Sequence, residues 1–187
     1  MAPTVSPYGS WKSPITAEVV SGGEIGLEQV RIDGDNIYWI ERRPHEGGRK
    51  VIIRRSADGK LSDVTPTGFN ARTRVHEYGG GDYAVADGRI IFSNFADQRL
   101  YRQDLGSEPK AVPPEGPFRY ADGQIDRRRN ILFSVREDHT GSREPINTLV
   151  RIDLSAGDTA VVVAGNDFYS SPRLSPDGLF LAWLTWN

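Results

Sequence analysis

LVRIDL, residues 149–154, repeats LYRQDL, residues 100–105, position by position. A second repeat is carried by the stretches NIYWI, RIIFS and NILFS, which align at Tyr38, Phe92 and Phe133. The repeat length is roughly 40 to 50 residues, and each repeat holds short apolar stretches separated by turns rich in Gly, Pro, Asp and Asn. Four strands in such a period are typical of the antiparallel blades of a β-propeller.

The apolar residues in the central stretches of these repeats are continuous, as in IYWI (37–40), RIIF (89–92) and LFLAWL (179–184). A sheet with one face in water would alternate apolar and polar residues, so these strands are predicted to be covered on both faces, as stacked blades are. A two-sheet sandwich could also bury a few strands on both faces, but it would not explain the four-strand period. Core packing is expected for the tryptophans of these strands, Trp39, Trp183 and Trp186.

The chain is expected to divide into a lead-in and a partial propeller. Residues 1–24 are rich in Pro and Gly, which predicts an extended segment, and residues 15–20 within it fit either a strand or a short helix. Trp11, Ile15 and Val19 are expected to anchor this segment to a core. Residues 25–187 are expected to form the propeller, with blades at 25–66, 80–114 and 119–165 and a half-blade at 170–187.

The expected ring is not closed. Closed propellers have about four to eight blades, and about three and a half are expected here. The last apolar strand, residues 179–186, would lack neighbours, and unpaired strands invite association. We therefore expect the chain to be the front portion of a longer protein, and by itself to self-associate or to be marginally stable.

Charge and composition argue against several classes of function. The 187 residues carry 23 Lys and Arg against 25 Asp and Glu, a balance that does not predict a nucleic-acid partner. The triple arginine 127–129 falls in an expected hairpin turn, where it would protect a sheet edge, and Glu137 and Asp138 beside a loop are expected to be solvated. There is no cysteine, hence no disulfide. No signal peptide and no apolar run of about 18 residues are found, so a cytoplasmic protein without a membrane partner is expected.

The usual machinery of hydrolysis and metal binding is missing from the sequence. No G-x-S-x-G motif occurs, and none of the serines beside a glycine has a strand-turn-helix context: Ser10, Ser107 and Ser142. The three histidines are far apart and have no metal-ligand spacing: His45, His76 and His139. We therefore expect no metal, no cofactor and no catalytic residue in this chain.

The stretch RTRVHEYGGGDY, residues 72–83, concentrates the chemically capable side chains. It comes just before the innermost strand of the second blade, where side chains could overhang the mouth of the central channel. There Glu77 could meet a substrate amine and Arg74 a carboxylate or carbonyl, with His76 and Tyr78 as further candidates for substrate binding or gating. The alternative is that Glu77 pairs with Arg74 or His76 and holds the loop. The three glycines allow a tight turn or a close backbone approach.

Four motifs, in the same order, resemble the N-terminal β-propeller of the prolyl oligopeptidase family, in its dipeptidyl aminopeptidase and acylaminoacyl peptidase branch. They are YGSWKSPITAE (8–18), VRIDGDNIYWIERRPHEGGRKVIIR (30–54), NARTRVHEYGGGDY (70–83) and SPRLSPDGLFLAWLTW (171–186). The resemblance covers nearly the whole chain. It implies a propeller that precedes an α/β-hydrolase domain with a Ser-Asp-His triad and admits only short peptides to it.

No position in this chain matches the nucleophile or either triad partner of that family, so the catalytic α/β-hydrolase domain is absent from it. The chain is interpreted as the propeller fragment of a serine peptidase that releases dipeptides or acyl-amino acids from short peptides. Its expected role is substrate gating, without activity by itself. The alternative is a stand-alone propeller-like scaffold or ligand-binding module.

Overall fold

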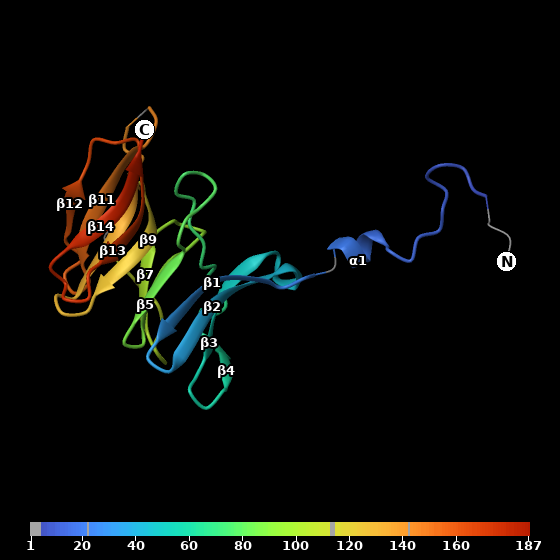
Figure 1. The fold of residues 1–187 in the computed structure, drawn as a ribbon, viewed down its shortest axis with the longest axis horizontal. Helices are drawn as coiled ribbons and strands as arrows, with labels where there is room; N and C mark the ends of the chain where they lie inside the picture. Colours follow the sequence, from blue (N-terminus) through green and yellow to red (C-terminus); the bar gives the residue numbers. More distant parts are fainter. Residues whose placement is uncertain (1–4, 22, 113–114, 142) are drawn as a thin grey trace.

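Antiparallel sheets that follow one another along the chain make up the structure (Figure 1). Three of them have four strands and one has two, which confirms the expected open all-β arc of propeller blades. The computed structural model describes residues 5–21, 23–112, 115–141 and 143–187. Residues 1–4 and 22 of the expected lead-in, residues 113–114 of the expected second blade, and Ser142 lie outside the described residues.

Each four-stranded sheet is a meander in which neighbours in the sheet are neighbours in the chain. Blade 1 contains β1 (Gly26–Asp33), β2 (Asn36–Arg43), β3 (Arg49–Arg55) and β4 (Leu61–Asp63), with a 3-10 turn at Pro44–Glu46. Blade 2 contains β5 (Tyr83–Ala86), β6 (Arg89–Ser93), β7 (Leu100–Asp104) and β8 (Lys110–Ala111). Blade 3 contains β9 (Phe118–Asp126), β10 (Ile131–Asp138), β11 (Ile146–Asp153) and β12 (Thr159–Val163). The half-blade, blade 4, contains β13 (Phe168–Leu174) and β14 (Leu181–Trp186).

The tight turn between β5 and β6 shows how local sequence and blade packing agree. Asp87 and Gly88 both have left-handed backbone angles, with φ of 52° and 72°, which suit the two central positions of a hairpin turn. Their backbone N–H groups donate to the two carboxylate oxygens of Asp33, at 2.9 and 2.7 Å. Blade 1 therefore holds the turn of blade 2 in place.

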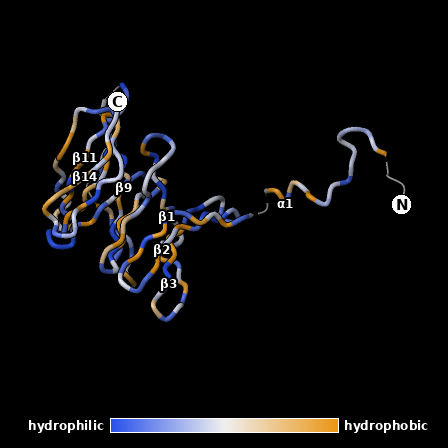
Figure 2. The backbone as a smooth tube through the Cα atoms, viewed as in Figure 1, coloured by the Kyte–Doolittle hydropathy of each residue, from blue (hydrophilic) through white to orange (hydrophobic). Residues whose placement is uncertain are grey.

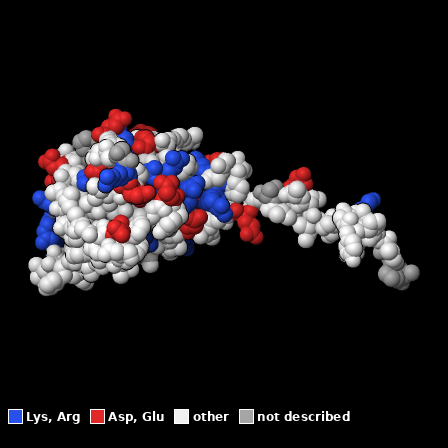
Figure 3. All heavy atoms as spheres, turned by 90° about the horizontal axis from the view of Figure 1, so that it is seen from above, with Lys and Arg blue, Asp and Glu red and all other residues white. Residues whose placement is uncertain are grey.

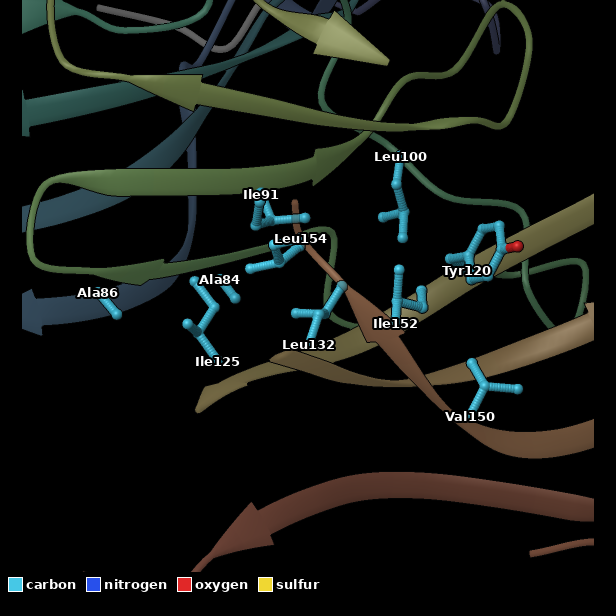
Figure 4. Close-up of a cluster of buried hydrophobic side chains, with 10 residues drawn as sticks. All are labelled: Ala84, Ala86, Ile91, Leu100, Tyr120, Ile125, Leu132, Val150, Ile152 and Leu154. Carbon is cyan, nitrogen blue, oxygen red and sulfur yellow. The ribbon is translucent and has the colours of Figure 1, made fainter. Parts of the chain in front are cut away.

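Blade 2 is covered on both faces, as its continuous apolar strand predicted. Ile90 and Phe92 pack against Tyr38 of blade 1, whereas Ile91 between them packs against Leu132 of blade 3. Tyr38 of β2 and the three β6 side chains are each at most 2% exposed. Figure 4 shows the cluster between blades 2 and 3, to which β5, β6, β9, β10 and β11 all contribute. Stacking of successive sheets therefore builds the core.

The prediction that residues 179–184 are covered on both faces is wrong. Trp183 packs toward blade 3, but Leu184 on the other face is 62% exposed, because no described strand lies beyond β14. Trp39 is half-buried and Trp186 is 42% exposed, so full core packing also fails for these two tryptophans.

The N-terminal segment does not dock on the propeller. Residues Ala17–Ser21 form a short helix, α1, which resolves the choice between strand and helix, and the segment extends away from the sheets (Figures 1 and 2). Trp11, Ile15 and Val19 are all exposed, so the expected anchoring is wrong. Among the described residues, no helix is long and apolar enough to span a membrane.

Polar side chains link the innermost strands of successive blades. Gln29, Asp122 and Ser171 occupy bulges of β1, β9 and β13, each with a left-handed φ between 53° and 55°. Gln29 exchanges hydrogen bonds with Asp82 just before β5, at 2.7 and 2.8 Å. Asp122 accepts the N–H groups of Gly81 and Ser171, at 2.6 and 2.8 Å. One carboxylate thus joins blades 2, 3 and 4.

Candidate functional site

The candidate residues lie on a turn between β4 and β5. Val75 anchors this turn in the core between blades 3 and 4, where it packs with Tyr169. The carbonyl of Arg74 accepts the N–H of Glu77 at 2.9 Å. His76 and Glu77 have φ of 55° and 63°, a region that residues other than glycine seldom occupy. A turn with this geometry requires support from its surroundings.

Glu77 pairs with an arginine of a neighbouring blade. Its Oε1 atom accepts a hydrogen bond from Arg119 Nη1 of β9 at 2.7 Å, and the same nitrogen donates to the Arg74 carbonyl at 3.1 Å. The hydrogen bond from Arg119 lowers the pKa of Glu77, although the glutamate side chain is 81% exposed. The alternative in which Glu77 pairs with Arg74 or His76 is therefore wrong in its partner, since Arg119 belongs to blade 3.

His76 lies beside two aromatic rings of the half-blade, and Tyr78 lies beside His76. The His76 ring is 5.3 Å from Phe168 and 6.3 Å from Trp186, centroid to centroid, and these two rings stack on each other. Tyr78 is exposed, with its ring 6.0 Å from that of His76.

Arg74 points elsewhere. Its guanidinium lies 4.4 Å from the centre of the Phe95 ring, and its backbone N–H donates to Gln98 at 2.7 Å. The structure therefore brings His76, Glu77 and Tyr78 together along one cleft and leaves Arg74 outside it.

Glu137 supports the turn, and the expectation that it is solvated is wrong. It is 2% exposed, and its Oε1 atom accepts the backbone N–H of His76 at 2.5 Å. Its Oε2 atom lies 3.0 Å from His139 Nε2 and 3.8 Å from Arg119. In the sequence, only the position of Glu137 near the end of an apolar strand indicates burial, because its hydrogen-bond partner His76 is 61 residues away.

The three glycines of the stretch are explained by close packing against β9. Gly79 has a left-handed φ of 96°. A Cβ atom on Gly80 would lie 3.0 Å from the Cβ atom of Ala121, and one on Gly81 would lie 2.6 Å from the Asp122 carboxylate. The chain therefore needs these glycines both for a backbone angle and for a close approach.

A cleft of about 810 Å³ opens beside the turn. Its walls are residues 76–78, Glu137, the segment 144–147 where β11 begins, and the segment 165–168 where β13 begins. The end of the molecule that carries these segments shows acidic and basic side chains side by side (Figure 3). The cleft combines aromatic rings with several carboxylates.

A second cavity, of about 420 Å³, lies between blades 1 and 2 and is more strongly polar. Lys50 Nζ lies 2.7 Å from Glu28 and 3.0 Å from Asp82. Burial raises the pKa of Asp82, while its hydrogen bonds oppose that shift. Arg42 and Arg72 line the same cavity without an acidic partner among the described residues. Nor do the described residues contain a group of three His, Cys, Asp or Glu arranged to hold a metal ion.

Solved structures of puromycin hydrolases match the chain over its whole length. A crystal structure of puromycin hydrolase is 31% identical, with a TM-score of 0.86, over 99% of this chain. A Mycobacterium tuberculosis puromycin-hydrolyzing peptidase is 37% identical, with a TM-score of 0.85, over 99% of this chain. The chain spans 31% of the length of each of these two proteins.

No protein-family model and no curated protein matches the chain. The structural matches are nevertheless strong, and they place the chain on the N-terminal propeller portion of enzymes of one family. The resemblance seen in the sequence motifs is thereby confirmed: the chain matches the N-terminal propeller portion of prolyl oligopeptidase-family peptidases.

Proposed function

We propose that this chain is the propeller portion of a serine peptidase and that it controls which peptides reach a catalytic domain. The observation that carries the proposal is the match of 99% of the chain to puromycin hydrolase, at a TM-score of 0.86. The face that carries the cleft offers aromatic rings and carboxylates to a short peptide. The activity proposed for the whole protein is release of dipeptides or acyl-amino acids from short peptides in the cytoplasm.

The role of Glu77 in this proposal is either a contact to the substrate or a brace for the turn. The hydrogen bond to Arg119 favours the brace, whereas the exposure of the carboxylate favours the contact. A double-mutant cycle separates the two roles, because coupled residues give non-additive effects on stability.

The experiment compares Glu77→Gln, Arg119→Gln and the double variant in the full-length protein. If Glu77 contacts substrate, Glu77→Gln raises KM about tenfold at unchanged kcat and stability, since a hydrogen bond to a charged group is lost. If it is a brace, both single variants lower the free energy of unfolding and the double variant is no worse. Glu108→Gln, at an exposed carboxylate far from the turn, is the matched control.

The alternative, a stand-alone ligand-binding propeller, makes a different prediction about the parent gene. A peptidase requires sequence after Asn187 that contains a G-x-S-x-G motif in a strand-turn-helix setting. A ligand-binding propeller requires only further blades. Hydrolysis of a peptide substrate by the 187-residue chain alone would contradict the proposed division of labour.

A further inference from the structure

The cavity between blades 1 and 2 carries more positive charge than its acidic side chains neutralise. Three cationic and two acidic side chains line it: Arg42, Lys50, Arg72, Glu28 and Asp82. Lys50 is engaged by both acids, at 2.7 Å from Glu28 and 3.0 Å from Asp82. Arg42 and Arg72 have no acidic partner among the described residues. An excess of one positive charge in a cavity favours a ligand that carries a single negative charge.

The acidic side of the cavity is already occupied by donors of the protein. Asp82 is 2% exposed, and its Oδ1 atom accepts the backbone N–H of Thr73 at 2.7 Å. Its Oδ2 atom accepts hydrogen bonds from Lys50 Nζ at 3.0 Å and from Gln29 Nε2 at 2.7 Å. Both carboxylate oxygens therefore have partners, and Asp82 does not attract a cationic ligand into the cavity.

The two arginines are positioned by contacts that do not use their side-chain N–H groups. Arg42 of β2 lies across Gly26 of β1, where a Cβ atom would be 3.3 Å from Arg42 Nε, so the missing side chain makes room for the guanidinium. The Arg72 guanidinium lies 4.8 Å from the centre of the Phe95 ring, and the Arg72 backbone N–H donates to the Ser93 carbonyl at 2.9 Å. No described residue accepts a hydrogen bond from either guanidinium. Stacking on a ring uses the face of a guanidinium and leaves its N–H edge for a ligand.

We propose that this cavity binds a carboxylate group. Arg42 and Arg72 donate to its oxygens, because a guanidinium matches a planar carboxylate with two parallel hydrogen bonds. Tyr78 lines the same cavity and is exposed, so its ring can pack against the body that carries the carboxylate. The carboxylate has two possible sources, the carboxy terminus of a short peptide and a free carboxylic acid, and only the first rests on the proposed function.

Titration calorimetry on the full-length protein tests the site with 3-phenylpropionate and with 3-phenylpropionamide, which has a similar shape and no charge. The carboxylate is expected to bind at least about tenfold more tightly, because hydrogen bonds between charged groups are stronger. Arg42→Gln and Arg72→Gln are each expected to weaken binding of 3-phenylpropionate about tenfold and to leave binding of the amide unchanged.

Arg151→Gln, at an exposed arginine of β11 in blade 3, is the matched control and should bind both probes as the wild type does. Chemical denaturation checks that each variant is folded. Equal binding of the two probes by the wild type, or binding of 3-phenylpropionate that the substitutions at Arg42 and Arg72 leave unchanged, would overturn the inference.

Steady-state hydrolysis of tripeptides with a free or an amidated carboxy terminus identifies the source of the carboxylate. If the peptide supplies it, the amidated peptide has a KM about tenfold higher at unchanged kcat, and Arg72→Gln removes this difference. Equal KM values, together with 3-phenylpropionate binding that depends on Arg72, would assign the site to a free carboxylic acid. The same binding without hydrolysis of either peptide would contradict the proposed peptidase function alone.

Discussion

The backbone of Gly81 passes beside Asp122 so closely that a Cβ atom would lie 2.6 Å from the carboxylate oxygen and 3.2 Å from the Asp122 Cα atom. At the same place the Gly81 N–H donates to that oxygen. A methyl group at position 81 would therefore displace the Asp122 carboxylate that accepts the hydrogen bond of this residue. Because the Asp122 backbone is also close, the carboxylate has little room to move away.

Gly81→Ala is therefore expected to lower the free energy of unfolding by about 1–3 kcal/mol through steric overlap. Chemical denaturation of the full-length protein measures this. Gly141→Ala is the control, because there a Cβ atom would meet nothing closer than 4.0 Å. Equal stability of the two variants would show that β9 can shift to make room.

At the scale of an element, the turn between β9 and β10 shows three neighbouring arginines acting between blades. Arg127 lies 3.0 Å from Asp33 of blade 1 and 2.7 Å from Asp87 of blade 2. Arg128 and Arg129 donate to backbone carbonyls of the β13–β14 turn, at 2.5 and 3.0 Å. The expected edge-protecting role is therefore incomplete, since these side chains also bind the neighbouring blades.

Asp126 organises this turn and gives it a predictable dependence on pH. Burial opposes its charge, but hydrogen bonds from the Arg129 side chain and from two backbone N–H groups outweigh burial and lower its pKa. A carboxyl group with a lowered folded-state pKa stabilises the fold fully above its unfolded pKa of about 4, and this stability is lost as the pH falls through the folded pKa.

Asp126→Asn is expected to lower the free energy of unfolding by about 1–3 kcal/mol at pH 7. The difference from wild type should shrink as the pH falls below about 4, because the wild-type carboxyl then becomes protonated. Urea denaturation between pH 2.5 and pH 7 follows this, and Asp35→Asn, at an exposed turn residue, is the control. A difference that is constant with pH would contradict the role of the charge.

The strands could be predicted from the sequence and most of the candidate site could not. The predicted strand stretches 37–40 and 89–92 lie within β2 and β6, because apolar runs and turn residues are local signals. The partners of His76 and Glu77 come from blade 3, 61 and 42 residues away. Such contacts depend on how a loop of one blade lies across the next, and no local pattern encodes that.

At the scale of the whole molecule, the stack of blades ends in two uncovered faces. Ile32 pairs with Ile37 on the face of blade 1 that points away from blade 2, and its side chain is exposed. Leu184 is exposed on the face of blade 4 that points away from blade 3. Between these ends, neighbouring blades pack on one another through three clusters of buried residues, whereas the outer faces of blades 1 and 4 each expose apolar side chains.

The 187-residue chain by itself is therefore expected to self-associate through these two faces, because exposed apolar sheet faces and strand edges favour association. Sedimentation velocity should show an average mass that rises with concentration. Ile32→Lys and Leu184→Lys should each shift the distribution toward monomer, since a charge on the face opposes its burial. Val5→Lys, at an exposed apolar residue of the N-terminal segment, should have no effect if the faces drive association. A monodisperse monomer that melts cooperatively would mean that an open arc of blades is stable without covering its ends, and that burial between neighbouring blades is sufficient for folding.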